Sequence, residues 1–344
     1  MTPIPALIAA IPLAAGLVGA PSGSPDSSPA SAGVVQHVAA RTGAEQHRVL
    51  GYWTPERMAG ALPAGLLGPV ETAGRAASGA LPLRVLSPRP PAQTSSTAKA
   101  APRSPVVPVQ GAGAPRVSTS GARWAAGGAV TRTTGRVFLT LAGVDYVCSA
   151  SAVSSRNLDV VVTAGHCVKD GAGAWAENWA FVPGYEPGRR PYGTFTARRM
   201  FVPEPWSRSA DDSDDLGMVA VNPSGGRHLG QAVGGQEIGF DLPRGRRAYG
   251  FGFPADPPYD GRRLIYCSGD LHGDPNGQTG DQGMRCDLTA GSSGGPWLSS
   301  FDPATGQGVV TSVSSFKYSD DPGTMYGPYF GRQARRVFEA AQRA

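Results

Sequence analysis

Short apolar runs separated by turns dominate the chain from about residue 122 onward. The runs are four to five residues long, and the clearest of them are residues 137–141, 146–150, 160–163, 218–221, 248–251 and 309–313. Runs of this length, bounded by Gly, Pro and Asp, are typical of an all-β sandwich or barrel. Residues 332–343 differ, because Ala334, Val337, Phe338 and Ala341 recur at helical spacing. We therefore expect an all-β domain that ends in one helix.

The charge of the chain is divided unevenly along its length. The first 120 residues hold 9 basic and 4 acidic side chains and the remainder holds 22 of each, so the first part carries the whole net charge of +5. No run of five or more basic residues occurs, although such runs are typical of nucleic-acid-binding patches. The charge therefore gives no support to a nucleic-acid partner.

Residues 1–20 are uncharged and mostly apolar. They resemble the apolar core of a secretory signal peptide, although the usual basic start is missing. Pro3, Pro5 and Pro12 make the segment a poor membrane-spanning helix. We expect a secreted, extracellular protein with no membrane attachment once this signal is removed. The alternative is an Ala- and Pro-rich tail without structure.

Residues 21–125 are expected to form a propeptide and linker. Both ends of this region are rich in Pro, Ser, Ala, Thr and Gly, a composition that buries too little apolar surface to offset the entropy of ordering the chain. Between the two ends lies an apolar island, residues 48–63, in which Thr54 is expected to cap a short helix with Pro55 at its first position. We expect the island, with Trp53 in it, to dock on the folded domain as a propeptide would. The alternative is residual local structure.

All four cysteines lie in the neutral part of the chain. Two separations of 19 residues favour the local disulfides Cys148–Cys167 and Cys267–Cys286, although four cysteines allow three connectivities. Disulfides persist in oxidising compartments, in agreement with secretion. A zinc site is the alternative interpretation, but no Cys-x-x-Cys pair occurs, and we expect no metal.

Three segments carry the residue types that nucleophilic catalysis requires. They are Thr163-Ala-Gly-His166-Cys167, the acidic turn that ends in Asp215-Leu-Gly, and Gly291-Ser-Ser293-Gly-Gly-Pro296. A serine hydroxyl becomes an effective nucleophile when an imidazole takes its proton, and a buried carboxylate holds that imidazole in the required tautomer. A tight Gly-rich turn can supply the two backbone N–H groups that stabilise an oxyanion. The three segments together predict acyl transfer.

The order His, Asp, Ser and the residues around each of them resemble the chymotrypsin/trypsin-like serine peptidases. The resemblance is closer to the secreted bacterial branch, which includes the glutamyl endopeptidases, and it extends from residue 135 to the C-terminus. It implies two six-stranded antiparallel β-barrels in a peptidase domain of residues 126–344. The active site would lie between the barrels, and the C-terminal helix would pack on the second barrel.

The resemblance also assigns roles to single residues. His166, Asp215 and Ser293 would form the catalytic triad, and the backbone N–H groups of Gly291 and Ser293 would form the oxyanion hole. Asp214 is the alternative to Asp215 as the acid of the triad. Calcium binding is an alternative role for the acidic turn.

Two conflicting clues leave the substrate preference open. Asp287 stands six residues before Ser293, where trypsin-like enzymes place the carboxylate that selects Arg or Lys; alternatively, it bonds to local backbone groups. Ser315, Phe316 and Lys317 would line the same pocket, where the ammonium of Lys317 would oppose a basic substrate residue or attract an acidic one.

The residue before the expected nucleophile bears on activation. It is Ser292, where the trypsin subfamily has an Asp that pairs with a newly freed N-terminal ammonium. We expect activation to use another device, the removal of residues 21 to about 125.

These features favour a secreted serine endopeptidase that is made as a precursor and hydrolyses peptide bonds through an acyl-enzyme. Its expected partners are protein or peptide substrates and its own propeptide, and we expect a monomer that needs no cofactor. The alternatives are a catalytically inactive binding protein on the same fold and an esterase that uses the same triad.

Overall fold

The computed structural model describes residues 33–65 and 117–344. The expected signal, residues 1–20, and much of the expected linker lie outside the described residues. Within the described ranges, no helix is both long enough and apolar enough to cross a membrane.

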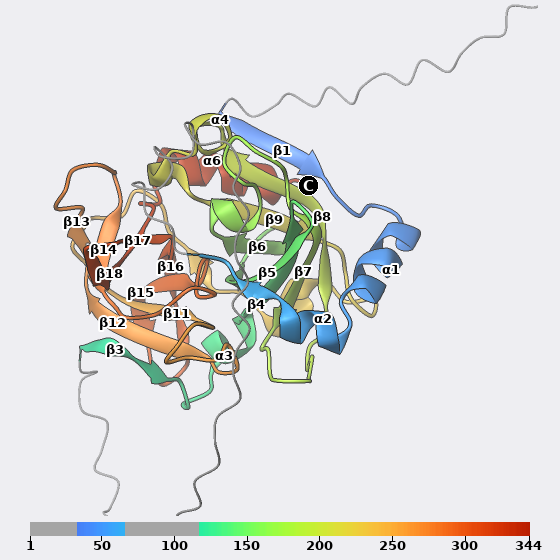
Figure 1. Cartoon of the computed structure of the whole chain (residues 1–344), viewed down its shortest axis with the longest axis horizontal. Coiled ribbons are helices and arrows are strands. Elements are labelled where there is room, and N and C mark those ends of the chain that lie inside the picture. The colour runs from blue at the N-terminus through green and yellow to red at the C-terminus, as the bar shows by residue number, and fades with distance from the viewer. Residues whose placement is uncertain (1–32, 66–116) are drawn as a thin grey trace, which may run out of the picture. The chain divides into compact units, whose positions relative to one another are not determined.

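The first half of residues 117–344 forms a closed β-barrel (Figure 1). Within the described residues, its strands run in the order β8-β7-β4-β5-β6-β9, and pairing of β8 with β9 closes the ring. The strands are β4 (Thr134–Leu141), β5 (Val144–Val153), β6 (Val160–Thr163), β7 (Glu177–Pro183), β8 (Phe195–Pro203) and β9 (Gly217–Val221). Val137 and Leu139 of β4 face the interior with Phe181 of β7, as the two-residue period of a strand requires.

The second half contains two sheets within the described residues. One runs in the order β10-β16-β15-β11-β12-β3, and the other in the order β13-β14-β18-β17. The strands are β3 (Ser118–Arg123), β10 (Glu237–Ile238), β11 (Arg247–Gly252), β12 (Ile265–Asp270), β13 (His272–Gly273), β14 (Gln282–Arg285), β15 (Pro296–Asp302), β16 (Gln307–Val313), β17 (Phe316–Tyr318) and β18 (Asp321–Gly327). The all-β fold predicted from the short apolar runs is confirmed.

The helices are short except at the C-terminus and in the N-terminal segment. They are α1 (Gly43–Tyr52), α2 (Pro55–Gly60), α3 (Ala129–Thr133), α4 (Glu204–Ser209), α5 (Leu229–Val233), α6 (Arg332–Ala341) and the 3-10 turns η2 (Gly165–Cys167) and η3 (Asp212–Asp214). The helix predicted at the C-terminus is α6, and its Ala334 and Val337 are buried. It contacts β8 and β9 of the first barrel, whereas the resemblance implied packing on the second. Its apolar face meets Phe201 and Met218, which these two strands turn away from the barrel interior.

Residues 118–124, which precede the domain start expected at residue 126, pack on the second half. Strand β3 pairs with β12, and the backbone N–H of Asp287 donates to Thr119 in β3 at 3.2 Å. Trp124 makes edge contacts with Phe251 and Tyr266. The expected boundary falls inside this packed region because polar, Gly-containing residues 118–121 pair through their backbone, which a composition argument does not register.

The N-terminal segment, residues 33–65, lies along the first barrel. Strand β1 (Val34–Val38) pairs antiparallel with β8, and β2 (Leu62–Pro63) pairs parallel with β5. Between these strands, α2 begins as predicted: the Thr54 side chain accepts a hydrogen bond from the Arg57 N–H, with Pro55 in the first turn. In Figure 1 this segment is the blue run through α1 and α2.

Candidate active site

His166 lies on a sharp turn directly after β6. The strand ends at Thr163, and Gly165 begins the 3-10 turn η2 that carries His166. A Cβ on Gly165 would lie 2.9 Å from both a carboxylate oxygen of Asp215 and the ring nitrogen of Trp206. The glycine before His166 is therefore needed for the close approach of the turn to Asp215.

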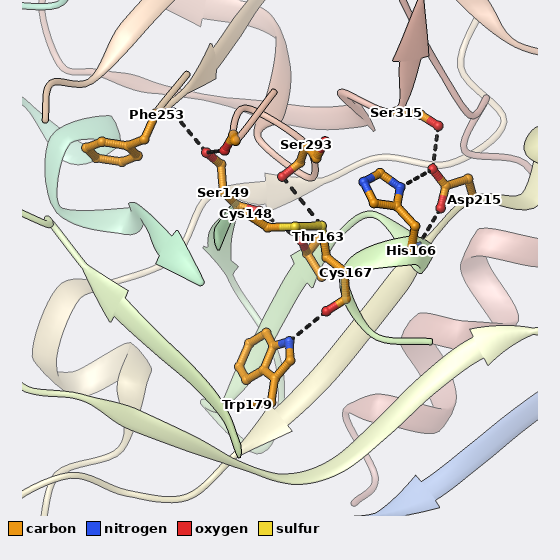
Figure 2. The surroundings of a disulfide bond; sticks show 11 residues. Cys148, Ser149, Thr163, His166, Cys167, Trp179, Asp215, Phe253, Ser293 and Ser315 are labelled. Carbon is orange, nitrogen blue, oxygen red and sulfur yellow. Dashed lines mark hydrogen bonds and ion pairs between the residues drawn. A yellow bond between two sulfur atoms is a disulfide. The ribbon is translucent and has the colours of Figure 1, made fainter. Parts of the chain in front are cut away.

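Two disulfides join Cys148 to Cys167 and Cys267 to Cys286, the pairs predicted from their spacing. The first links β5 to the His166 turn, and Figure 2 shows its surroundings.

Asp215 receives two hydrogen bonds from His166. Its Oδ2 accepts from the imidazole Nδ1 at 2.8 Å, and its Oδ1 accepts from the His166 backbone N–H, also at 2.8 Å. The Ser315 hydroxyl donates a third hydrogen bond to Oδ2 (Figure 2). The Asp215 carboxylate accepts a hydrogen bond from Nδ1. The proton of a neutral imidazole therefore lies on Nδ1, and Nε2 keeps its lone pair.

The charges of this pair stabilise one another inside the protein. Burial alone would lower the pKa of His166, but the negative charge of Asp215 and its hydrogen bond outweigh burial and raise that pKa, with Asp212 contributing. Burial alone would raise the pKa of Asp215, but His166 and the Ser315 hydroxyl hold it below its ordinary value. The arrangement therefore keeps Asp215 ionised and favours an imidazolium beside it.

Ser293 is fully buried in the loop of residues 289–295, which we name the Ser293 loop. Gly294 has a positive φ of 79°, and a Cβ there would lie 2.0 Å from the Thr163 hydroxyl. The Ser293 carbonyl oxygen accepts from the backbone N–H of Ser149 on β5 at 2.8 Å. Neither Ser293 Oγ nor His166 Nε2 has a hydrogen-bond partner among the described residues. The loop is thus packed against the first barrel, with its hydroxyl unengaged.

The Ser149 side chain supports the same loop. Its hydroxyl donates to the Gly291 carbonyl oxygen at 2.9 Å and accepts from the Phe253 N–H at 2.8 Å. The Gly291 N–H, expected in the oxyanion hole, donates to the Ala64 carbonyl oxygen at 3.2 Å. Neither Ser149 nor Ala64 was among the expected site residues, because each acts at a contact between segments far apart in the sequence.

The Asp287 carboxylate bonds to neighbouring structure. Its Oδ1 accepts from the Gly121 backbone N–H at 2.6 Å and from the Tyr259 hydroxyl at 2.8 Å. One of these partners is a backbone group, but it lies on strand β3, far from Asp287 in the sequence. The ammonium of Lys317 donates to the carbonyl oxygens of Cys286 and Pro322 at 2.8 and 2.6 Å.

The environments of the other pocket candidates differ. Burial lowers the pKa of Lys317 to about 8, although Asp287 and Asp321 oppose the shift. Phe316 is 1% exposed and stacks on Tyr326. Ser315 is engaged with Asp215, so the four candidates do not share one group of contacts.

Two carboxyl groups of the acidic turn before Asp215 have raised pKa values. Burial, with the nearby charge of Asp215, raises the pKa of Asp212 to about 7, and burial with Asp211 raises that of Asp214 to about 6. Asp281 is 1% exposed, and burial raises its pKa well above the ordinary value.

A shared metal ion is not favoured by the donor groups of the site. In the described part of the chain, the one group of ligand-type side chains close enough to share an ion is Cys148, His166 and Cys167. Both sulfurs are consumed in the disulfide, which leaves the imidazole as the good donor of the three.

Comparison with solved structures identifies two relatives that are named as proteases. The protease Anisep from Arthrobacter nicotinovorans is 38% identical, with a TM-score of 0.60 over 62% of this chain and 96% of that one. The thermostable serine protease AL20 from an extremophilic microorganism is 35% identical, with a TM-score of 0.59 over 63% of this chain and 99% of that one. A Glu endopeptidase, solved in complex with MPD, is 17% identical with a TM-score of 0.52 over 65% of this chain and 97% of that one, and it shows likeness of fold alone.

Sequence comparison gives a match over a shorter part of the chain. An extracellular metalloprotease of Bacillus subtilis (strain 168) is 32% identical over 114 residues, which is 33% of this chain and 35% of that protein's length. No protein-family model matches the chain. The protease Anisep and the serine protease AL20 are matched over nearly their whole length and share the fold described above. The chain therefore belongs to the chymotrypsin/trypsin-like serine peptidase family.

Proposed function

We propose that this chain is the precursor of a secreted serine endopeptidase whose triad is His166, Asp215 and Ser293. The observation that carries the proposal is the double hydrogen bond from His166 to Asp215, which leaves imidazole Nε2 available to take a proton. The buried Ser293 hydroxyl, which has no partner in the described part of the chain, is the nucleophile.

The reaction would proceed in two stages. His166 Nε2 takes the proton of Ser293 Oγ while that oxygen attacks the scissile carbonyl carbon, and Asp215 stabilises the imidazolium that forms. The N–H groups of Gly291 and Ser293 stabilise the oxyanion. The imidazolium then gives its proton to the leaving amine, and a water molecule hydrolyses the acyl-enzyme by the same proton transfers.

Secretion and peptide substrates are part of the proposal. Two disulfides support an oxidising compartment, and the Bacillus subtilis relative is named as extracellular. The named proteases among the relatives support protein or peptide substrates. We propose that the catalytic part acts as a monomer.

The test is labelling of the processed, secreted protein with a fluorophosphonate probe, which reacts with an activated serine. We expect the wild type and Ser292→Ala to be labelled and Ser293→Ala to remain unlabelled. Ser292 is the matched control because its hydroxyl donates to the Thr289 carbonyl at 2.7 Å and takes no part in the proposed chemistry. A folded wild type that is neither labelled nor able to cleave a peptide would contradict the proposal.

A further inference from the structure

We propose that residues 61–65 inhibit the enzyme in its precursor by binding to the Ser293 loop, with the Ala64 carbonyl on the Gly291 N–H. This inference rests on the function proposed above and concerns the regulation of that same site. The inhibitory element belongs to the N-terminal segment, residues 33–65, and it acts within one chain.

Ala64 is bound on both sides by the walls of the site. Its N–H donates to the Val147 carbonyl on β5 at 2.9 Å, and its carbonyl accepts from the Gly291 N–H at 3.2 Å. Ala64 is 8% exposed and packs in the hydrophobic cluster that contains Cys148 and Cys167. Cys167 directly follows His166 in the chain. Ala64 thus bridges the first barrel and the Ser293 loop.

The Ala64 carbonyl occupies a hydrogen-bond donor, the Gly291 N–H, that the proposed reaction needs. One backbone N–H makes one well-aligned hydrogen bond, and the Gly291 N–H cannot serve a substrate carbonyl while it serves Ala64. The Ser293 hydroxyl has no partner within the described residues, so the segment engages the oxyanion donor without a hydrogen bond to the nucleophile.

The anchor of the segment lies away from the Ser293 loop, on the outer face of the first barrel. Trp53 is 1% exposed and packs with outward-facing residues of β4, β5 and β7, namely Phe138, Val147, Ala180 and Val182. Its indole N–H donates to the Asn178 carbonyl at 2.5 Å, and Arg190 donates to the Trp53 carbonyl at 3.0 Å. Because the anchor is continuous with residues 61–65, it keeps them at a high effective concentration beside Gly291.

A second pair of contacts strengthens the anchor. The Tyr52 hydroxyl donates to Asp145 Oδ1 at 2.8 Å, and Arg57 donates to Asp145 Oδ2 at 3.1 Å. Asp145 lies in strand β5, whose next residues, Tyr146 and Val147, pair with β2. The anchor and the inhibitory residues therefore hold the same strand.

The decisive experiment compares Ala64→Arg with Leu62→Arg in the full chain. The two positions are two residues apart, but Ala64 is 8% exposed and Leu62 is 54% exposed. An arginine at position 64 cannot stay in the small buried site, whereas an arginine at position 62 extends into solvent. Neither substitution alters residues 117–344.

The readout is the rate of fluorophosphonate labelling of intact precursor, followed by intact mass so that processed molecules are counted separately. This rate scales with the fraction of molecules whose Ser293 loop is free of residues 61–65. We expect Ala64→Arg to label about tenfold faster than wild type or more, and Leu62→Arg to label at the wild-type rate. Trp53→Ala, which loosens the anchor without touching the Ser293 loop, should also accelerate labelling.

Each outcome bears on one of the two proposals. If unmodified precursor labels as fast as processed enzyme, or if Ala64→Arg and Trp53→Ala both label at the slow wild-type rate, the inhibitory role is wrong. If Leu62→Arg accelerates labelling as much as Ala64→Arg, the contact of Ala64 is not the cause. If processed wild type is itself unlabelled, the proposed endopeptidase function fails, and the inference fails with it.

Discussion

The Ser149 hydroxyl donates a hydrogen bond to the Gly291 carbonyl oxygen at 2.9 Å, from the first barrel to the Ser293 loop. The Ser149 hydroxyl oxygen also accepts a hydrogen bond from the Phe253 N–H in the second half at 2.8 Å (Figure 2). One buried side chain therefore fixes the loop against both halves of the protein, and with it the peptide groups expected to form the oxyanion hole.

Ser149→Ala should lower kcat more than it raises KM. The substitution leaves the Gly291 carbonyl and the Phe253 N–H without their partner, and each buried unsatisfied group costs about 1–3 kcal/mol. The Gly291 peptide would then be less well aligned, and we expect a loss in kcat of about tenfold, less than the 10²–10³ of removing an oxyanion donor itself. Steady-state kinetics on a peptide substrate give both constants.

Ser151→Ala is the matched control for this prediction. Ser151 is buried on the same strand, but its hydroxyl contacts the carbonyl of Ala152 and not the Ser293 loop. It should keep kcat near the wild-type value. Equal losses in both variants would mean that a general disturbance of β5, and not the alignment of Gly291, sets the rate.

Gly294→Ala should destabilise the protein and abolish activity. Its φ of 79° is left-handed, and the new Cβ would lie 2.0 Å from the Thr163 hydroxyl and 2.5 Å from the Ser149 carbonyl oxygen. Gly226→Ala is the control, because its φ is 75° and nothing lies within 4 Å of the added Cβ. Thermal unfolding should show a cost of about 1–2 kcal/mol for the control, from backbone strain alone, and a larger cost for Gly294→Ala. Similar losses would show that the Ser293 loop can move to accept a methyl group.

Much of the fold was predictable because it depends on local pattern. The run at residues 160–163 is β6, and the helical spacing after residue 331 is α6. Strand β3 was missed because Ser118–Arg123 contains almost no apolar residues and is held by backbone pairing with β12. The packing side of α6 was also missed, since its apolar stripe does not say which barrel will cover it.

The residues of the candidate site also differ in how far the sequence predicts them. His166, Asp215 and Ser293 were expected because short flanking motifs surround each of them, and their roles stay predictions. Ser149 carries no motif, and Ala64 lies in a segment assigned to the propeptide from composition. Their contacts with Gly291 join residues more than 140 positions apart in one case and more than 220 in the other, and no local pattern in the sequence records such pairs.

The pH dependence of kcat/KM should have its acid limb above pH 6.5. His166 must be neutral to take the proton of Ser293, and its pKa is raised from the ordinary value of 6.5, mainly because Asp215 outweighs the opposing effect of burial. The imidazole therefore stays protonated, and inactive as a base, to a higher pH than an ordinary histidine. A limb centred below pH 6.5 in the processed enzyme would contradict this assignment.

Asp212→Asn should move that limb to lower pH. The charge of Asp212 raises the pKa of His166, so its removal lowers that pKa. The shift should be less than about one unit, because Asp212, with a pKa of about 7, is only partly ionised near the limb. Asp211→Asn is the control: Asp211 Oδ1 accepts from the Ser213 N–H, and an asparagine oxygen can still do so. The control should leave the limb in place, and a shift of equal size in both variants would assign the effect to the net charge of the turn.

Asp287→Ala should reduce stability and leave the residue preference of cleavage unchanged. The carboxylate accepts from the Gly121 N–H and the Tyr259 hydroxyl, and the loss of both bonds should cost about 1–3 kcal/mol in thermal unfolding. Asp287→Asn separates charge from hydrogen bonding, because its amide oxygen can still accept from Gly121. We expect Asp287→Asn to be nearly as stable as the wild type and to give the same cleavage profile on a peptide library. If instead Asp287→Asn lost cleavage after Arg and Lys while it remained stable, the negative charge would be acting on substrate and not on strand β3.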